Sequence, residues 1–425
     1  MNWRLSQVLS VALAMTHVAE GTTEKRAAPA VTNQALYFAE GRDIVAANRS
    51  NGCEYWRVSG ENKSTPLIGT NAIRSSSVYY LPATLFKPAM VFAGDFYGNL
   101  YGVNAKTGAQ VWKAFMGENT AQNFITGSPQ AHNGKMFVPV ATKEVITTVL
   151  DILGTCCKSH GLLQAIDPYT GKIKWTYQTA PKAAYNANTG TYAPNGMSIW
   201  GTPLIDSANG SVIVGTGQNL SLPATSNSDS LIALNISTGA VKWIFQSTQG
   251  DAWNAACQAL AGLAVTDIWV NKLERLALTD LANVTATSAA NIGPVTGATP
   301  GLYALDLATG NVVWEKHLTH TYQGAVYASL FSAARTITND VLLAGNLSGE
   351  VKAFNSATGA ELWSCNTAIT VTDVNGEPGN GGTIDSAGPV PAGKDLFVNS
   401  GYNTFGGTNP WQAGPGNALF VFRLP

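Results

Sequence analysis

The chain has 425 residues, among them 43 glycines, 19 prolines and only 25 basic and 26 acidic side chains. Hydrophobic residues make up 45% of the sequence, which excludes disorder for most of the chain, because disordered proteins combine low hydrophobicity with high charge. The formal net charge of −1 provides neither a basic face for nucleic acid nor a general attraction to anionic membranes.

We expect the chain to begin with a secretory signal peptide over residues 1–21. Arg4 supplies the positive start, residues 5–15 are mostly apolar, and residues 19–21 offer small side chains at the spacing of a cleavage site. The apolar run is too short to cross a bilayer, which takes about 20 residues. The protein is therefore expected to be secreted and extracellular.

A dibasic pair, Lys25-Arg26, follows the signal peptide. It indicates a short pro-segment over residues 22–26, although a chance pair in a flexible terminus is the alternative. The mature domain then covers residues 27–425 and contains no apolar run long enough to span a membrane.

Secretion exposes cysteines to an oxidising compartment and allows Asn-x-Ser/Thr sequons to be glycosylated. The five cysteines are an odd number, so at least one stays unpaired. They are Cys53, Cys156, Cys157, Cys257 and Cys365. Sequons begin at Asn48, Asn62, Asn209, Asn219, Asn235, Asn283 and Asn346. A chain rich in Ser and Thr contains several sequons by chance, so they agree with secretion without establishing it.

One segment recurs along the chain and dominates its organisation. Each copy has a small residue, Asp or Asn two positions later, Gly four after that, and Trp eight after the Asp or Asn. The copies span residues 44–56, 100–112, 163–175, 231–243, 302–314 and 351–363. Alternating apolar residues before the Asp or Asn predict a strand, and the polar side chain and the Gly predict a tight turn. Each copy is therefore expected to be a hairpin whose Trp packs on a neighbouring sheet and donates its indole N–H to a carbonyl.

Successive Asp or Asn positions lie 56, 63, 68, 71 and 49 residues apart, which leaves room for two further strands in each unit. Apolar runs at residues 90–94, 136–140, 211–217 and 341–345 are such strands. Repeated four-stranded sheets predict an all-β fold, a single β-propeller.

We expect seven blades, six from the repeats and one from the C-terminal strands at residues 386–390, 395–401 and 418–422. This last unit lacks its Trp strand, so the N-terminal segment is expected to supply the fourth strand and to close the ring. Eight blades are the alternative, but residues 258–300 lack the strand pattern and their apolar spacing looks partly helical.

The repeat resembles the docking repeat of quinoprotein alcohol dehydrogenases, propellers that hold pyrroloquinoline quinone on their axis. Several blocks are similar to the polyvinyl-alcohol-dehydrogenase-like branch of that family, namely residues 94–112, 125–129, 156–157, 198–206, 250–257 and 381–389. The resemblance implies a secreted oxidoreductase that oxidises an alcohol group of a small molecule or polymer and passes electrons to an external acceptor. The alternative is a non-catalytic propeller that serves as a binding or scaffold module.

The resemblance also implies residues that contact the cofactor. Trp200 matches the Trp on which the quinone plane stacks, and an ordinary core Trp is the alternative. Cys156 and Cys157 match a vicinal disulfide that lies over the quinone, with free or separately paired cysteines as the alternative.

The resemblance also implies a calcium ion. Carboxylate and amide oxygens are ligands that Ca²⁺ prefers. Glu144 matches the acidic metal ligand, and the Gln218-Asn219 segment matches the one that supplies an amide oxygen, although the family usually has Asn where this chain has Gln218. For Glu144 a solvated loop carboxylate is the alternative.

Alcohol oxidation needs a base that takes the hydroxyl proton. The family's Asp after the Trp of the block at residues 250–257 is replaced here by Asn254, as it is in the polyvinyl-alcohol-dehydrogenase-like branch. Asp385 and Asp251 are the remaining acidic candidates, with structural hydrogen bonding and turn capping as their alternatives. Asp385 is favoured because the small residues around it let a ligand approach the backbone closely. In the related branch a further blade follows the position of residue 257, and we expect this chain to have lost or replaced that blade over residues 258–300.

Overall fold

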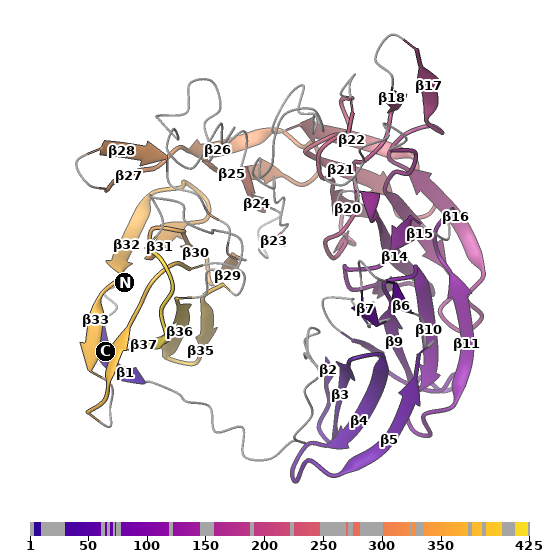
Figure 1. Cartoon of the computed structure of the whole chain (residues 1–425), viewed down its shortest axis with the longest axis horizontal. Helices are drawn as coiled ribbons and strands as arrows, with labels where there is room; N and C mark the ends of the chain where they lie inside the picture. Colours follow the sequence, from indigo (N-terminus) through magenta and orange to yellow (C-terminus); the bar gives the residue numbers. More distant parts are fainter. Residues whose placement is uncertain are drawn as a thin grey trace. The chain divides into compact units, whose positions relative to one another are not determined.

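The computed structural model describes residues 4–9, 30–60, 64–65, 69–70, 73, 78–118, 122–144, 157–187, 191–221, 225–246, 269–270, 275–280, 301–322, 325–328, 331, 333, 335–372, 376–384, 388–401 and 413–423. All of its named elements are β-strands, which confirms the all-β fold class (Figure 1). The chain forms two compact units. One comprises His17–Cys257, and the other comprises Met1–Thr16 together with Gln258–Pro425.

The unit of residues 17–257, here called the four-sheet unit, contains four antiparallel sheets built from consecutive stretches of chain. The first sheet holds β2 (Ala30–Val31), β3 (Ala35–Glu40), β4 (Asp43–Asn48) and β5 (Glu54–Ser59), and the second holds β8 (Tyr79–Leu81), β9 (Met90–Gly94), β10 (Asn99–Asn104) and β11 (Gln110–Phe115). The third holds β12 (Asn123–Phe124), β13 (Gln130–His132), β14 (Lys135–Thr142), β15 (Leu162–Ile166) and β16 (Ile173–Gln178), and the fourth holds β19 (Leu204–Asp206), β20 (Ser211–Gly215), β21 (Ser230–Asn235) and β22 (Val241–Gln246). Two small hairpins accompany them, β6 (Ser64–Thr65) with β7 (Gly69–Thr70) and β17 (Ala184–Asn186) with β18 (Thr191–Ala193).

The second unit, here called the three-sheet unit, repeats this construction. Its first two sheets hold β23 (Trp269–Val270), β24 (Arg275–Asp280), β25 (Gly301–Asp306) and β26 (Val312–Lys316), then β29 (Thr336–Thr338), β30 (Val341–Gly345), β31 (Glu350–Asn355) and β32 (Glu361–Asn366). Its third sheet joins β35 (Val390–Ala392), β36 (Asp395–Ser400) and β37 (Ala418–Arg423) to β1 (Arg4–Leu9). Hairpins β27 (Thr319–Tyr322) with β28 (Ala325–Ala328) and β33 (Thr370–Thr372) with β34 (Pro378–Asn380) lie between the sheets in the chain.

All six predicted hairpins form, and their register explains the repeat. The small residue pairs directly with the Trp across the hairpin, as in Gly102 opposite Trp112 and Ala304 opposite Trp314. A register shift follows in every copy, and the repeat Gly adopts a positive φ, for example 74° at Gly108. The side chain of Asn104 caps the turn by accepting hydrogen bonds from the backbone of Lys106 and Thr107.

The repeat Trp docks one hairpin on the turn of the next. The indole N–H of Trp56, Trp112 and Trp314 donates to the carbonyl that directly follows the Asp or Asn of the next copy, at 2.9–3.0 Å. These contacts confirm, for three of the six copies, the prediction that the indole finds a backbone carbonyl, whereas the buried Nε1 of Trp175 has no hydrogen-bond partner among the described residues. The Gly of that next turn lies under the indole, so it is required for space as well as for its φ. A Cβ built on Gly171 would lie 2.9 Å from the ring of Trp112.

We expect Gly171→Ala to destabilise the fold more than Gly134→Ala. Both glycines have a φ of 70°, but a Cβ on Gly134 would meet nothing within 4 Å. Gly134→Ala should therefore cost about 1–2 kcal/mol of left-handed backbone strain, and Gly171→Ala about 1–3 kcal/mol more through the clash with the indole. Urea unfolding of both variants measures the difference, and equal losses would show that the Trp contact is unimportant.

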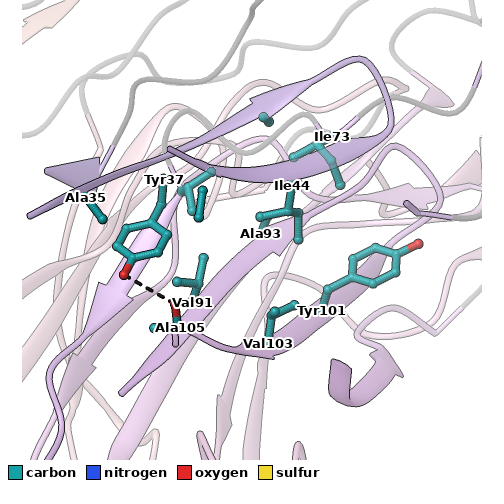
Figure 2. Packing of buried hydrophobic residues seen from close by; sticks show 12 residues of the cluster. Ala35, Tyr37, Ile44, Ile73, Val91, Ala93, Tyr101, Val103 and Ala105 are labelled. Carbon is teal, nitrogen blue, oxygen red and sulfur yellow. Dashed lines mark hydrogen bonds between the residues drawn. The ribbon is translucent and has the colours of Figure 1, made fainter. Parts of the chain in front are cut away.

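Inner strands such as β9 and β10 are buried on both faces, because apolar residues occupy successive positions along them. Figure 2 shows one such core, in which Tyr37 and Ile44 of one sheet pack against Val91 and Tyr101 of the next. The hydroxyl of Tyr37 donates to the carbonyl of Ala105 across this contact, at 3.4 Å. The alternate residues of β9 and β10 belong to the core on the other side of their sheet. Two-sided burial accounts for the almost continuous apolar sequence of these strands.

The structure corrects two parts of the sequence analysis. Residues 258–300 are not devoid of strands, because β23 and β24 lie there and β24 pairs with β25 along six residues, Arg275 to Asp280. Six blades, rather than seven or eight, take all their strands from consecutive stretches of chain. The sheet that would make a seventh blade depends on β1, which lies within the predicted signal peptide. Among the described residues, no helix is long and apolar enough to cross a membrane.

Candidate functional site

Trp200 is at the centre of the candidate site in the four-sheet unit, between β18 and β19. Its half-buried indole packs on a cluster formed by Phe96, Phe124 and Ala141. Thr126 fixes the backbone by donating its hydroxyl to the carbonyl of Trp200 at 2.9 Å. Gly217 leaves space beside the ring, since a Cβ built there would lie 3.7 Å from the indole nitrogen. Trp200 therefore presents a fixed and partly open aromatic surface.

Lys143 lies beside the same cluster, directly after β14, and the sequence analysis did not identify it. The residue is 3% exposed, and its Nζ is 4.7 Å from the ring centroid of Tyr97 and 5.6 Å from that of Phe96. Burial lowers the pKa of this ammonium group, and the negative charge of Asp95 opposes the shift. Nothing in the sequence distinguishes this lysine from a solvated one at a strand end.

Glu144 is buried, so its interpretation as a solvated loop carboxylate is wrong. Its Oε2 accepts hydrogen bonds from the backbone N–H of Lys158 at 2.8 Å and from the N–H and hydroxyl of Ser159 at 2.6 and 2.5 Å. The carboxylate thus anchors the segment that follows Cys157. Cys157 is disulfide-bonded, but Cys156 lies outside the described residues, so the vicinal pairing stays a prediction.

Gln218 and Asn219 follow β20, and their side-chain amides differ in their hydrogen bonding. Nε2 of Gln218 is buried and has no hydrogen-bond partner among the described residues. Asn219 is fully buried; its Oδ1 accepts from the N–H of Thr225 at 2.9 Å and its Nδ2 donates to the carbonyl of Asn195 at 3.2 Å. The Gln218 amide therefore has a donor to offer to a ligand, whereas the Asn219 amide supports its own loop.

The two candidate bases, Asp251 and Asp385, lie outside the described residues. The residue before Asp385, Ile384, is described, and its contacts match those of Ile125, which precedes Thr126 at Trp200. Ile384 packs against Gly345 as Ile125 packs against Gly94, and each isoleucine N–H donates to the carbonyl of the residue after that glycine at 3.1 Å. Ile384 and Ile125 thus occupy equivalent points beside β30 and β9, and Asp385 is the next residue after Ile384 in the sequence.

Two family models match the chain. The model described as glucose/ethanol/alcohol dehydrogenase, beta-propeller domain, matches residues 3–282, which is more than half of the sequence. The chain belongs to this family. A second model, described as outer membrane protein assembly factor BamB, matches residues 190–414.

Named relatives of this dehydrogenase propeller agree with the match. A polyvinylalcohol dehydrogenase from Pseudomonas sp is 29% identical over 90% of this chain and 68% of its own length. Another from Sphingopyxis sp. is 27% identical over 90% of the chain and 67% of its own length. A quinohemoprotein alcohol dehydrogenase from Comamonas testosteroni is 24% identical over 59% of the chain and 37% of its own length.

Solved structures support the fold alone. BamB from Moraxella catarrhalis has a TM-score of 0.51 at 16% identity and covers 96% of this chain and 99% of its own. The quinohemoprotein alcohol dehydrogenase ADHIIG from Pseudomonas putida has a TM-score of 0.52 at 16% identity and covers 96% of this chain and 75% of its own.

The described residues of this dehydrogenase propeller fit a flat ligand rich in oxygen acceptors better than they fit a metal. Trp200 offers the aromatic surface and Gln218 the unpartnered donor. By contrast, the carboxylate of Glu144 and the amide of Asn219 are engaged in internal hydrogen bonds, and the described part of the chain contains no group of three or more His, Cys, Asp or Glu that could hold an ion. The residues as placed do not form a ready Ca²⁺ site.

We expect His160, next to the Glu144 anchor, to make stability depend on pH. Both ring nitrogens are buried without a hydrogen-bond partner among the described residues, and burial lowers the pKa of the imidazole although Glu118 and Glu144 oppose the shift. The unfolded chain then takes up this proton first, so the free energy of unfolding should fall as the pH drops below about 6.5, the ordinary pKa.

His160→Gln should remove this dependence on pH because the amide does not titrate. Urea unfolding of wild type and variant at about pH 7.5 and about pH 5 measures the difference between them. Identical pH dependence of the two proteins would show that His160 is not responsible.

Proposed function

We propose that the chain is an oxidoreductase that uses pyrroloquinoline quinone to oxidise an alcohol group of a small molecule or polymer. The observation that carries the proposal is the Trp200 surface, an indole held by an apolar cluster on a chain that belongs to the alcohol dehydrogenase propellers. Stacking between an electron-rich indole and a flat, electron-poor ring is favourable. The Nε2 of Gln218 would donate to an oxygen of the same ligand.

The remaining roles follow from the chemistry. When bound, the quinone supplies the two-electron acceptor that takes the hydride from the alcohol carbon. The hydroxyl proton must go to a base, and we assign it to Asp385, with Asp251 as the second candidate. Cys157 and Cys156 would cover the ring. An external acceptor would be needed to take up the electrons.

Calcium enters the proposal only through the family resemblance of Glu144 and Gln218. Since Glu144 already anchors the backbone of Lys158 and Ser159, no step of the proposed reaction is assigned to a metal. Quinone uptake measured with calcium and with a chelator decides whether the ion is needed.

We further propose that the protein is secreted and that the termini close the ring. The pairing of β1 with β37 supports closure, but removal of residues 1–21 would remove β1 and leave β37 as an edge strand. N-terminal sequencing of the secreted protein decides between ring closure by β1 and removal of β1 with the signal peptide. A start near residue 22 or 27 excludes β1 as the closing strand, and an intact start at Met1 excludes the signal peptide.

A second candidate function is a binding or scaffold module. The replacement of the family Asp by Asn254 and the match to the BamB model favour it. The deciding experiment incubates purified protein with pyrroloquinoline quinone, an artificial electron acceptor and a panel of secondary alcohols, including polyvinyl alcohol. Turnover supports the oxidoreductase. Quinone uptake without turnover of any alcohol supports the binding module, and neither uptake nor turnover contradicts the proposed function.

A further inference from the structure

Lys143 is a buried cation that has no matching anion in the described part of the chain. Its residue is 3% exposed, and its Nζ has no hydrogen-bond or ion-pair partner among the described residues; it contacts the faces of Tyr97 and Phe96. Burying an ammonium group away from water is costly unless it is paired, and aromatic faces compensate only part of that cost. The site is therefore short of negative charge.

Asp95 does not supply the missing anion directly. It is fully buried, and its two oxygens accept hydrogen bonds from the backbone N–H of Tyr97 and Asn99 at 2.8 Å and from Asn99 Nδ2 and the Tyr101 hydroxyl at 2.9 Å. The carboxylate thus fixes the β9–β10 turn and acts on Lys143 only at longer range.

Two other cations of the described chain, Arg57 and Lys352, are paired with carboxylates. Arg57 contacts the carboxylates of Glu40, Asp43 and Glu54 at 2.8–3.1 Å, although it is less buried than Lys143. Lys352 lies 3.5–3.6 Å from the carboxylates of Glu350 and Glu361. Carboxylates pair with both of these cations, whereas no described residue does so at Lys143, which leaves a place for an anionic group of a ligand.

The position of Lys143 indicates which ligand this is. Phe96, under its Nζ, packs with Phe124 at a ring-centroid distance of 4.7 Å in the cluster that supports the Trp200 indole. Gln218 Nε2 is a second buried donor for which the described residues provide no partner, and Gln218 follows Gly217, which lies beside that indole. Two unpaired donors next to one aromatic surface complement a flat ligand that carries oxygen acceptors on its edge.

We propose that Lys143 binds a carboxylate of the planar ligand that stacks on Trp200, and that it makes the site selective for carboxylated rings over neutral ones. This inference rests on the proposed function only for the location of the ligand on Trp200. The lysine acts as a binding residue through charge and hydrogen bonding, and it takes no part in proton transfer.

The test compares pyrroloquinoline quinone, quinoline-2,4-dicarboxylate and the dimethyl ester of the latter, with tryptophan fluorescence as the readout of binding. We expect both carboxylated ligands to bind the wild type, and the ester to bind at least about tenfold more weakly. Lys143→Met should weaken the carboxylated ligands by a similar factor and remove the preference over the ester. Lys143→Arg, which keeps the positive charge, should retain most of the preference for the carboxylated ligands.

The matched control is Lys87→Met, because Lys87 also has its Nζ over an aromatic ring, 4.9 Å from the centroid of Tyr169, but is exposed and far along the chain from Trp200. Lys87→Met should leave the affinity for all three ligands unchanged. Equal binding of acid and ester by the wild type, or unchanged acid binding in Lys143→Met, overturns the inference and leaves the proposed function standing. Binding of the quinoline dicarboxylate without binding of the quinone supports the inference and contradicts the proposed function. Failure of both ligands to bind contradicts both.

Discussion

Trp200→Ala should abolish the increase in stability that pyrroloquinoline quinone gives the protein. A ligand at about 100 times its Kd stabilises the folded state by about 2.7 kcal/mol, and the loss of the stacking surface should remove most of that gain. Calorimetric melting with and without the quinone measures the gain. Quenching of tryptophan fluorescence should disappear in the same variant.

Trp314→Ala is the matched control, because Trp314 is a docking tryptophan. Its indole N–H donates to the carbonyl of Ser356 at 2.9 Å, and a Cβ on Gly359 would lie 2.8 Å from its ring. Truncation should destabilise the fold by about 3–5 kcal/mol. If Trp200→Ala instead causes a loss of this size while the quinone effect persists, Trp200 is an ordinary core residue.

Asp385→Asn should lower kcat by about 100-fold or more while the melting temperature stays within a few degrees. The change keeps the shape of the side chain and removes its ability to accept the hydroxyl proton. Turnover of a secondary alcohol with the quinone and an artificial acceptor is the measurement. Asp251→Asn is the comparison and should have a much smaller effect. Full activity of Asp385→Asn, or a greater loss in Asp251→Asn, would reject the assignment.

The blade hairpins were predictable because their information is local. The Asp or Asn, the Gly and the Trp of each copy lie within nine residues of one another, and each has a distinct task in the turn or its docking. The Gly is also required because an indole packs against it. This contact could not be predicted, because Gly171 meets Trp112 of the preceding copy. Contacts between copies cannot be read from the spacing within one.

Strand β24 was missed for a related reason. Residues 258–300 are rich in Ala and Leu, which favour helices, whereas the pairing of β24 with β25 depends on the tertiary context of the sheet. The burial of Lys143 was equally inaccessible, since Tyr97 and Phe96 come from a turn in another sheet. Trp200 was found only because its block resembles a known family.

The central claim is that a quinone stacks on Trp200, and a crystal structure of the protein with pyrroloquinoline quinone tests it most directly. The account predicts density for the quinone plane about 3.5–4 Å from the indole of Trp200, with a carboxylate at Lys143 Nζ and an oxygen at Gln218 Nε2. Protein side chains covering both faces of that indole, or quinone bound elsewhere, would contradict it.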